Sequence, residues 1–463
     1  MNKNHAISTD ILQQFDVPGP RYTSYPTADR FVEAHGEAQY LQALEERRLT
    51  SRDKISPLSL YVHIPFCESL CYYCACNKII TGNYQRAVDY LADLGKEVDL
   101  LMPHLGKGQV VSQVHLGGGT PTFFQDRELH QLMGLLQSHF QFQKGGEFAI
   151  EVDPRTVDGH RLQTLWNLGF NRLSLGVQDF DPHVQQAVHR VQSVEQVRDL
   201  MTQARAMGFM SINLDLIYGL PMQTVPGWQR TLDQLLELKP DRLALYGYAH
   251  LPARFKPQRH IDVALLPSGQ QKTQMLATAL KTLEQAGYVY VGMDHFALPD
   301  DGLSVAKRQG RLHRNFQGYS MRPDGDLLGL GLSSIGSMGA SYVQNAKTLD
   351  EYSDLLNQGK LPVVKGISLS RDDLARRSVI MALMCQGRVE IASIEESHLL
   401  AFKSYFAREM QQLQAFVQQG LAHLDAQAIT VTERGWYVVR AIAMVFDKYV
   451  QADGQRAHFS KIL

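Results

Sequence analysis

A regular alternation of strand-like and helix-like segments runs through the middle of the chain and most constrains its fold. Between the strand-like segments lie amphipathic patterns of helical period, for example at 84–101, 127–140, 194–207 and 226–238. Strands that alternate with helices predict parallel βαβ units. The predicted strands are 58–66, 110–116, 147–152, 172–177, 211–218 and 243–248.

One face of these predicted strands is polar. In the fifth strand, Ile212 and Leu214 alternate with Asn213 and Asp215, and Glu151 lies on the polar face of the third. A parallel sheet covered by helices on both sides should be almost entirely apolar. Polar faces instead indicate a barrel whose lumen holds something polar. A closed barrel needs eight β/α units, and the chain offers six, so we predict an α/β fold with an open, partial (β/α)6 barrel.

The pattern changes on both sides of the predicted barrel. Residues 1–55 read as an N-terminal arm followed by a short helix, and 56–367 as the partial barrel with its extension. Residues 368–463 read as a separate, mainly helical C-terminal domain. A strand-like segment at 428–436 resembles part of a winged-helix module, but no basic recognition helix accompanies it, so we do not assign this domain to DNA.

Four of the five cysteines fall within ten residues, directly after the first predicted strand. Cys67, Cys71 and Cys74 have the spacing C-x3-C-x2-C, which can hold three irons of a [4Fe–4S] cluster and leave the fourth open to a small molecule. We expect Cys76 to lie nearby without binding iron. A four-cysteine zinc site is the alternative, although structural zinc usually takes two separated pairs of ligands. Cys385 lies in an apolar segment and reads as a core residue.

The overall charge argues against two classes of partner. The formal net charge is −1, so no global basic field points to nucleic acid or to an anionic membrane. No apolar stretch has the length of a membrane span or of a signal peptide. We therefore expect a cytoplasmic protein without nucleic-acid or membrane partners. We also expect a monomer, because no exposed heptad pattern is visible.

The cysteine motif, with Tyr73 before its last cysteine, resembles the signature of the radical S-adenosylmethionine (SAM) superfamily. The glycine run Gly117–Pro121 after the second strand resembles the motif that meets the amino group of SAM. Nearly end to end, the chain resembles the family of oxygen-independent coproporphyrinogen III oxidases (coproporphyrinogen dehydrogenases). Cys76 and the N-terminal arm match this family rather than the related haem chaperones, whereas Tyr73 and a spacer without a basic residue depart slightly from its pattern. The segments that carry the resemblance are 19–27, 61–67, 74–78, 151–154, 176–179, 215–221, 248–251, 292–296 and 312–319.

The resemblance implies a [4Fe–4S] cluster and two molecules of SAM. It places one SAM against Tyr61, Gly118, Glu151 and Ile335. It places the other against Tyr73, Gly119, Thr120, Gln178, Arg190, Asp215 and Ala249. The strand pattern supports part of this, because a buried carboxylate such as Asp215 needs a partner. A structural ion pair of Asp215 with Arg172 or Arg190 is the alternative.

The resemblance also implies the reaction. An electron from an unidentified low-potential donor would cleave SAM, and the resulting 5′-deoxyadenosyl radical would take a hydrogen from a propionate of coproporphyrinogen III. Loss of CO2 and an electron leaves a vinyl group, and two such events give protoporphyrinogen IX in haem biosynthesis. Basic residues suit a substrate with several carboxylates. The candidates are Arg21, on an arm that could close over the substrate, and the run Arg308, Arg311, His313 and Arg314. A haem chaperone, or a radical enzyme with another substrate, is the alternative.

Overall fold

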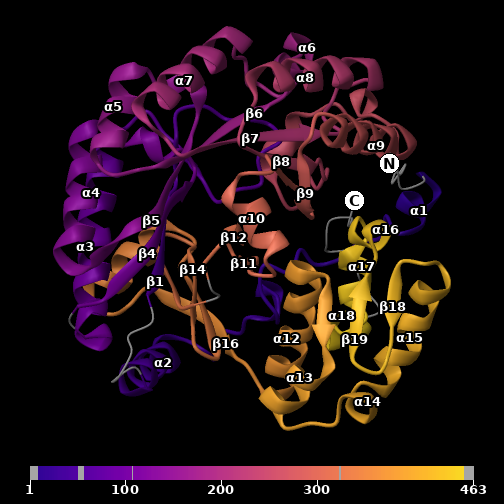
Figure 1. The fold of residues 1–463 in the computed structure, drawn as a ribbon. Coiled ribbons are helices and arrows are strands. Elements are labelled where there is room, and N and C mark those ends of the chain that lie inside the picture. Colours follow the sequence, from indigo (N-terminus) through magenta and orange to yellow (C-terminus); the bar gives the residue numbers. More distant parts are fainter. Residues whose placement is uncertain (1–8, 51–56, 107, 323–324, 453–463) are drawn as a thin grey trace.

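Six consecutive β/α units form the main part of the protein, as the alternation predicts. The computed structural model describes residues 9–50, 57–106, 108–322 and 325–452. The strands of the units are β1 (Leu58–Ile64), β4 (Val110–Gly118), β5 (Gln141–Val152), β6 (Arg172–Gln178), β7 (Ser211–Tyr218) and β8 (Arg242–Gly247). The helices that follow them are α3 (Gln85–Leu105), α4 (Asp126–His139), α5 (Gly159–Asn167), α7 (Val194–Met207), α8 (Val225–Leu238) and α9 (Gly269–Gln285). These helices form an arc outside the sheet (Figure 1).

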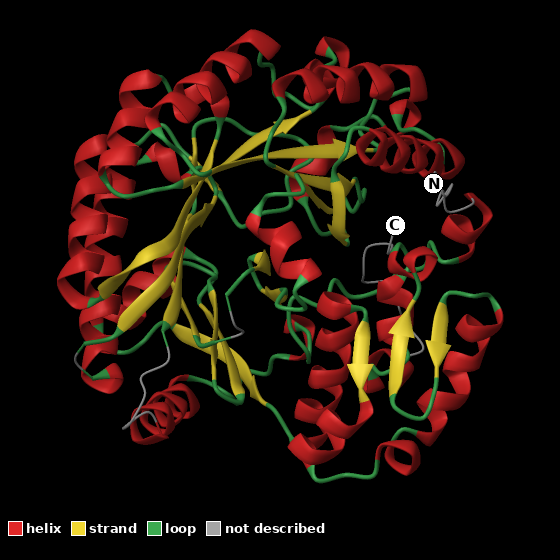
Figure 2. Ribbon diagram, in the orientation of Figure 1, coloured by secondary structure: helices red, strands yellow, loops and turns green. Residues whose placement is uncertain are grey.

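The six parallel strands are the middle of a larger open sheet. Its order is β16-β15-β14-β13-β1-β4-β5-β6-β7-β8-β10-β9, so β16 and β9 are the edges and the barrel does not close. Except for β13, which pairs parallel with β1, the added strands pair antiparallel (Figure 2). The added strands are β9 (Val289–Gly292), β10 (His295–Ala297), β13 (Leu327–Leu330), β14 (Ile335–Met338), β15 (Ser341–Asn345) and β16 (Val363–Ser368). A separate hairpin, β11 (His313–Asn315) and β12 (Gly318–Ser320), follows α10 (Gly302–Arg308).

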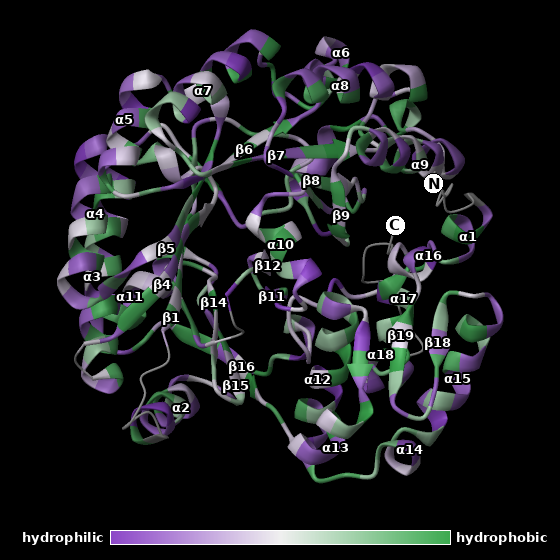
Figure 3. Ribbon diagram, in the orientation of Figure 1, coloured by the Kyte–Doolittle hydropathy of each residue, from purple (hydrophilic) through white to green (hydrophobic). Residues whose placement is uncertain are grey.

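The apolar face of each strand packs against the helices, as the alternation predicts. Leu60, Val62, Ile212 and Leu214 are fully buried in the main hydrophobic core. The helices of the outer arc carry both hydrophilic and hydrophobic residues, as expected for helices with one side in solvent (Figure 3). The opposite face of the strands is therefore left for the lumen.

A buried carboxylate joins α3 to the added strands. Glu97 accepts hydrogen bonds from the Gly331 N–H at 2.7 Å, from Asn345 Nδ2 at 2.6 Å and from the Tyr352 hydroxyl at 2.5 Å. Tyr352 lies on α11 (Leu349–Asn357), between β15 and β16. Burial raises the pKa of Glu97 to about 7, although the three donors oppose the rise. This one side chain therefore ties a barrel helix to the antiparallel extension.

The C-terminal region is mainly helical and contains a small sheet. Strands β17 (Arg388–Glu390), β18 (Ala422–Leu424) and β19 (Ala428–Val431) pair antiparallel in the order β17-β19-β18. The predicted strand-like segment 428–436 thus divides into β19 and a short helix. The helices of this region are α12 (Arg371–Gln386), α13 (Ile391–His398), α14 (Phe402–Tyr405), α15 (Ala407–Gln418), α16 (Glu433–Trp436), α17 (Val439–Met444) and α18 (Lys448–Ala452).

The N-terminal arm packs against this C-terminal region. It contains α1 (Thr9–Gln14) and leads to α2 (Glu37–Thr50), which covers the predicted helix. Tyr22 and Tyr25 are fully buried in a second hydrophobic core with residues of α12 and α17. The Tyr22 hydroxyl donates to Asp447 Oδ2 at 2.9 Å. Among the residues described, no helix has both the length and the apolar character needed to cross a membrane.

Replacing Glu97 tests the link between α3 and the extension. In Glu97→Gln the amide nitrogen faces groups that are themselves donors, so at least one buried donor loses its acceptor. We expect the free energy of unfolding to fall by about 2 kcal/mol, measured by chemical denaturation. Glu396→Gln, at an exposed position on α13, is the control and should change it little. Equal stability of the two variants would contradict this role of Glu97.

Candidate active site

The cysteine loop stands at the carboxyl end of β1. It begins in β2 (Phe66–Cys67) and returns in β3 (Ile79–Ile80), which pairs parallel with β2. The Ile79 N–H donates to Pro65 O at 2.7 Å, and the Tyr72 N–H to Val188 O at 3.0 Å. Both ends and the middle of the loop are therefore fixed by backbone hydrogen bonds above the barrel strands.

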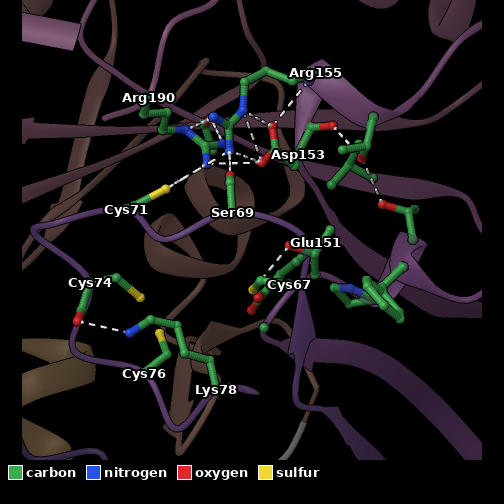
Figure 4. Close-up of a pocket in the computed structure, with 18 of the residues that line it drawn as sticks. Cys67, Ser69, Cys71, Cys74, Cys76, Lys78, Glu151, Asp153, Arg155 and Arg190 are labelled. Carbon is green, nitrogen blue, oxygen red and sulfur yellow. Dashed lines mark hydrogen bonds and ion pairs between the residues drawn. The ribbon is translucent and has the colours of Figure 1, made fainter. Parts of the chain in front are cut away.

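Cys67, Cys71 and Cys74 line one cavity of about 370 Å³. Figure 4 shows their sulfur atoms around the same open space. Burial raises the pKa of the Cys67 thiol to about 11, although a hydrogen bond from Thr120 opposes the rise. Cys76 also lines this cavity, and its hydrogen bond to Cys74 helps to lower the pKa of the Cys74 thiol to about 6. No three His, Cys, Asp or Glu side chains in the described part of the chain are close enough to hold a metal ion as they stand.

Two arginines approach the most enclosed of the thiols. Arg190 Nη1 lies 3.6 Å from Cys71 Sγ, and Arg155 Nη2 lies 3.9 Å from it. Both guanidinium groups also pair with Asp153, at 3.0 Å and 2.7 Å respectively (Figure 4). Two guanidinium groups beside Cys71 would offset the negative charge of a metal-bound thiolate. The donor set and its charge therefore fit an iron–sulfur cluster held by three thiolates.

The glycine turn after β4 packs directly against the cysteine loop. Gly118 has φ +115°, and a Cβ there would lie 2.7 Å from the ring of His63. A Cβ on Gly119 would lie 2.7 Å from the backbone carbonyl of Phe66. The Gly119 N–H donates to Ile64 O at 2.8 Å. Glycine is required here because the two backbones touch.

Glu151 faces the cavity from β5 and already has partners within the chain. Its carboxylate lies 3.1 Å from His115 Nε2 and accepts from the Gly118 N–H at 3.2 Å. Burial opposes ionisation, but these two contacts hold the pKa of Glu151 below its usual value. The side chain is 41% exposed, so an ionised carboxylate is presented to whatever occupies the cavity.

Among the described residues, the side chains that donate hydrogen bonds to Asp215 are neutral. Asn213 Nδ2 donates to it at 2.8 Å, and the Ser174 hydroxyl at 3.3 Å. The predicted alternative, an ion pair with Arg172 or Arg190, is wrong, because Arg172 lies by Glu147 and Arg190 pairs with Asp153. Burial and the charge of Glu151 raise the pKa of Asp215 to about 7. A cationic ligand would stabilise the ionised form.

The cavity brings most of the predicted residues together. Its walls include Cys67, Cys71, Tyr73, Cys74, Gly118, Gly119, Thr120, Glu151, Gln178, Arg190 and Asp215. Tyr61, Ala249, Ile335 and Arg21 are not part of its lining. Tyr61 lies on β1, with its hydroxyl 3.1 Å from His63 Nδ1, and Ile335 begins β14. The carbonyl groups of Ala249 and Tyr73 both accept from Gln258 Nε2.

Arg21 lies away from the thiols. It pairs with Asp294 and stacks over the ring of Tyr246, with 5.3 Å between the guanidinium carbon and the ring centroid. The predicted basic run divides: Arg308 and Arg311 are exposed, whereas Arg314 is buried and donates to Arg21 O.

Sequence reasoning missed Asp153, Arg155 and Lys78 as residues of the site. Asp153 caps the short turn that follows β5, and Arg155 lies within that turn. Lys78 Nζ donates to Cys74 O at 3.1 Å. All three lie within or beside segments that carry the family resemblance. Only Lys78 stands next to the cysteine motif in the sequence, and nothing in the sequence shows which thiol any of the three side chains approaches.

Comparison with known proteins places this site in a family. Residues 61–235 match the Radical SAM superfamily, and residues 369–438 match the HemN C-terminal domain. Oxygen-independent coproporphyrinogen III oxidases from Pseudomonas aeruginosa and Escherichia coli are each 46% identical, over 98% of both chains. The enzyme of that name from Helicobacter pylori is 42% identical over 99% of both chains.

A solved structure shows the same fold. The structure of coproporphyrinogen III oxidase from Escherichia coli, described as a radical SAM enzyme, superposes with a TM-score of 0.90 at 46% identity. It covers 96% of this chain and 100% of its own. Fold and site thus define a radical SAM protein, whose cofactors are a [4Fe–4S] cluster and SAM. Within that superfamily, the chain belongs to the family of oxygen-independent coproporphyrinogen III oxidases.

A methyl group at Gly119 should disturb both halves of the site. Because its Cβ would press on the Phe66 carbonyl, Gly119→Ala must displace either the glycine turn or the start of the cysteine loop. We expect the affinity for SAM to fall at least about tenfold, a cost of about 1.4 kcal/mol, measured by equilibrium dialysis on reconstituted protein. Gly134→Ala, on α4 with open space around its Cβ, should bind as the wild type does. Unchanged affinity in Gly119→Ala would refute the tight approach.

SAM affinity should depend on pH through Asp215. The pKa of this carboxyl is raised to about 7, so it becomes neutral as the pH falls through that value and loses its attraction for a cation. We expect SAM to bind about tenfold more weakly at pH 6 than at pH 8. Asp215→Asn should bind weakly at both pH values and lose most of this dependence. A pH profile of Asp215→Asn parallel to that of the wild type would exclude Asp215 as its source.

Proposed function

We propose that this chain catalyses the oxidative decarboxylation of two propionate side chains of coproporphyrinogen III to vinyl groups, which gives protoporphyrinogen IX. The observation that carries the proposal is the single cavity in which three thiols, the glycine turn and a carboxylate without a cationic partner meet at the mouth of the open barrel. Full-length similarity to enzymes named for this substrate supports the choice of reaction.

The cluster would be held by Cys67, Cys71 and Cys74, with Cys76 outside its ligand set. When bound, the cluster and SAM supply the radical chemistry that removes a hydrogen from the substrate. Arg155 and Arg190, which lie beside Cys71, would offset the negative charge of the thiolates. The chain's own part is to bind, orient and shield, and no side chain has to act as nucleophile.

The two sets of predicted SAM contacts lie side by side, since Gly119 and Thr120 of the second set directly follow Gly118 of the first. Tyr61, Gly118, Glu151 and Ile335 lie on β1, β4, β5 and β14. Gln178 and Asp215 lie on β6 and β7, and Tyr73 and Arg190 lie near Cys71. The family resemblance supports two SAM molecules, one against each set. Glu151 and Asp215 would then each offer a carboxylate to a cationic ligand.

The surroundings of the reaction are also part of the proposal. We infer a cytoplasmic monomer that receives electrons from a low-potential donor, with neither nucleic acid nor membrane as partner. The five cysteines are free thiols, which suits a reducing compartment. The near-neutral net charge agrees with the absence of polyanionic partners.

Two cysteine variants test the cluster and the function together. Cys71→Ala removes the most enclosed predicted ligand, so it should lose most of its iron and more than 99% of the activity, on the order of a loss of 3 kcal/mol or more in transition-state stabilisation. The activity is measured anaerobically with a reductant, SAM and coproporphyrinogen III, by the fluorescence of the oxidised product. Cys76→Ala should keep its cluster absorbance.

Each result of these assays would contradict a different part of the proposal. A Cys76→Ala protein without a cluster would show that the ligand set is wrong. A reconstituted wild type that cleaves SAM and leaves coproporphyrinogen III unchanged would refute the substrate. Tight haem binding without turnover would indicate a haem chaperone instead.

A further inference from the structure

A second cavity lies deeper in the barrel lumen. It has a volume of about 180 Å³ and shares Glu151, Ser174 and Asp215 with the cavity at the cysteine loop. Its far wall includes Arg172 at the start of β6, Arg242 at the start of β8 and His295 at the start of β10. We call it the lower cavity. None of these three side chains is among the predicted contacts of the cluster or of SAM.

Buried donors without acceptors gather around the lower cavity. Within the described residues, Arg172 Nε and Nη1 and Arg242 Nη2 have no hydrogen-bond partner. Gln317 Nε2 on the same walls is also unpartnered, as is Arg314 Nη1 nearby, and so is His295 Nδ1, which can donate or accept according to its tautomer. Glu147 Oε1, an acceptor 3.8 Å from Arg172 Nη2, also has no hydrogen bond among the described residues. A buried donor left unpaired costs about 1–3 kcal/mol, so this excess of donors suits an anion.

The lower cavity is lined by Glu147, Glu151 and Asp215 as well as by Arg172 and Arg242, and the two arginines keep donors that these carboxylates do not accept from. Arg242 is held by Asp301, with both carboxylate oxygens 2.9 Å from Nε, which leaves its Nη2 directed elsewhere. Arg172 approaches its nearest carboxylate, Glu147, only to 3.8 Å. Burial, together with the charges of Arg314, Arg21 and Arg242, lowers the pKa of His295 to about 3. His295 is therefore neutral, and three arginines make its surroundings positive.

We propose that the lower cavity binds a carboxylate of the substrate, a propionate that is not reacting, between Arg172 and Arg242. This inference rests on the proposed function. The lower cavity is too small for a tetrapyrrole ring and large enough for one of its side chains. Arg172 and Ser174 are two residues apart on one face of β6, so they are separated by about 7 Å along the strand. The propionate would thus lie deeper in the lumen than Glu151 and Asp215, by the distance that separates Arg172 from Ser174.

The same carboxylate chemistry is also present in the amino-acid part of SAM. That source is disfavoured by position, because a SAM that reaches the cysteine loop lies on the other side of Glu151 and Asp215. Those two carboxylates attract its cationic groups and so favour its position on the side of the cysteine loop. Four propionates on one substrate, by contrast, need several positive sites at once.

The test compares variants of the reconstituted holoenzyme. Arg172→Gln removes one charge, and Arg242→Lys keeps a cation beside Asp301 but removes the unpartnered Nη2. The probes are coproporphyrin III, which carries the same four propionates, its tetramethyl ester, which carries none, and SAM. Affinities come from fluorescence titration for the porphyrins and from equilibrium dialysis for SAM. Arg198→Gln, at a partly exposed ion pair on α7, is the matched control.

We expect each of the two variants to raise the Kd for coproporphyrin III at least about tenfold. The Kd values for the ester and for SAM should stay within about twofold, because neither probe places a carboxylate there. Arg172→Lys should restore part of the affinity for the acid, a result that a merely structural role would not give. Arg198→Gln should match the wild type for all three probes.

Three results would overturn the inference. Unchanged affinity for coproporphyrin III in folded Arg172→Gln and Arg242→Lys would show that other groups satisfy these donors. A loss of SAM affinity alone would assign the carboxylate to SAM. An equal loss for acid and ester would indicate a change of shape rather than of charge. A wild-type protein that converts no coproporphyrinogen III would instead refute the proposed function. An active wild type with variants that bind coproporphyrin III normally would refute only the role of the lower cavity.

Discussion

The contact between the glycine turn and the start of the cysteine loop is the constraint on which the site depends. The Gly119 N–H reaches Ile64 O and the Thr120 N–H reaches Phe66 O, both at 2.8 Å. No side chain fits between the two backbones. The end of β4 is therefore joined to the residues that lead into Cys67, which fixes the height of the thiols above the barrel. Glu151 and Asp215 are positioned relative to that height by their own strands, β5 and β7.

The strands below the thiols carry charge in levels. Arg155 and Arg190 stand nearest to Cys71, where thiolates need positive partners. Glu151 and Asp215 form the next level, where carboxylates suit cationic ligands. Arginines again line the lower cavity. Because residues of one sheet face recur every second position, a polar strand face can present opposite charges at successive depths. The polar alternation in the sequence thus becomes an ordered series of sites.

Much of this could be predicted from the sequence, because local periodicity determines it. The six parallel strands, their buried apolar faces and the position of the cysteine loop follow from alternation and spacing alone. The strands β9, β10 and β13 to β15 were missed, since each is only three to five residues long and too short to show a period. The pairing of Arg190 with Asp153 was missed for a different reason. That pairing depends on which of several charged side chains come together in the folded chain. The sequence does not show the distances between residues that lie far apart along it.

Buried arginines hold the N-terminal arm in place. Arg440 on α17 donates to the carbonyl groups of Gly19 and Pro20, and Arg314 donates to that of Arg21. These contacts bring Arg21, Arg314 and Arg440 close together. Burial and the charges of the other two lower the pKa of Arg440 to about 9. Asp294 offsets the charge of Arg21, and Arg314 and Arg440 donate to backbone carbonyl groups of the arm. On the proposed function, these arginines would attract a substrate with four propionates, so the groups that hold the arm would also take part in recognising the substrate.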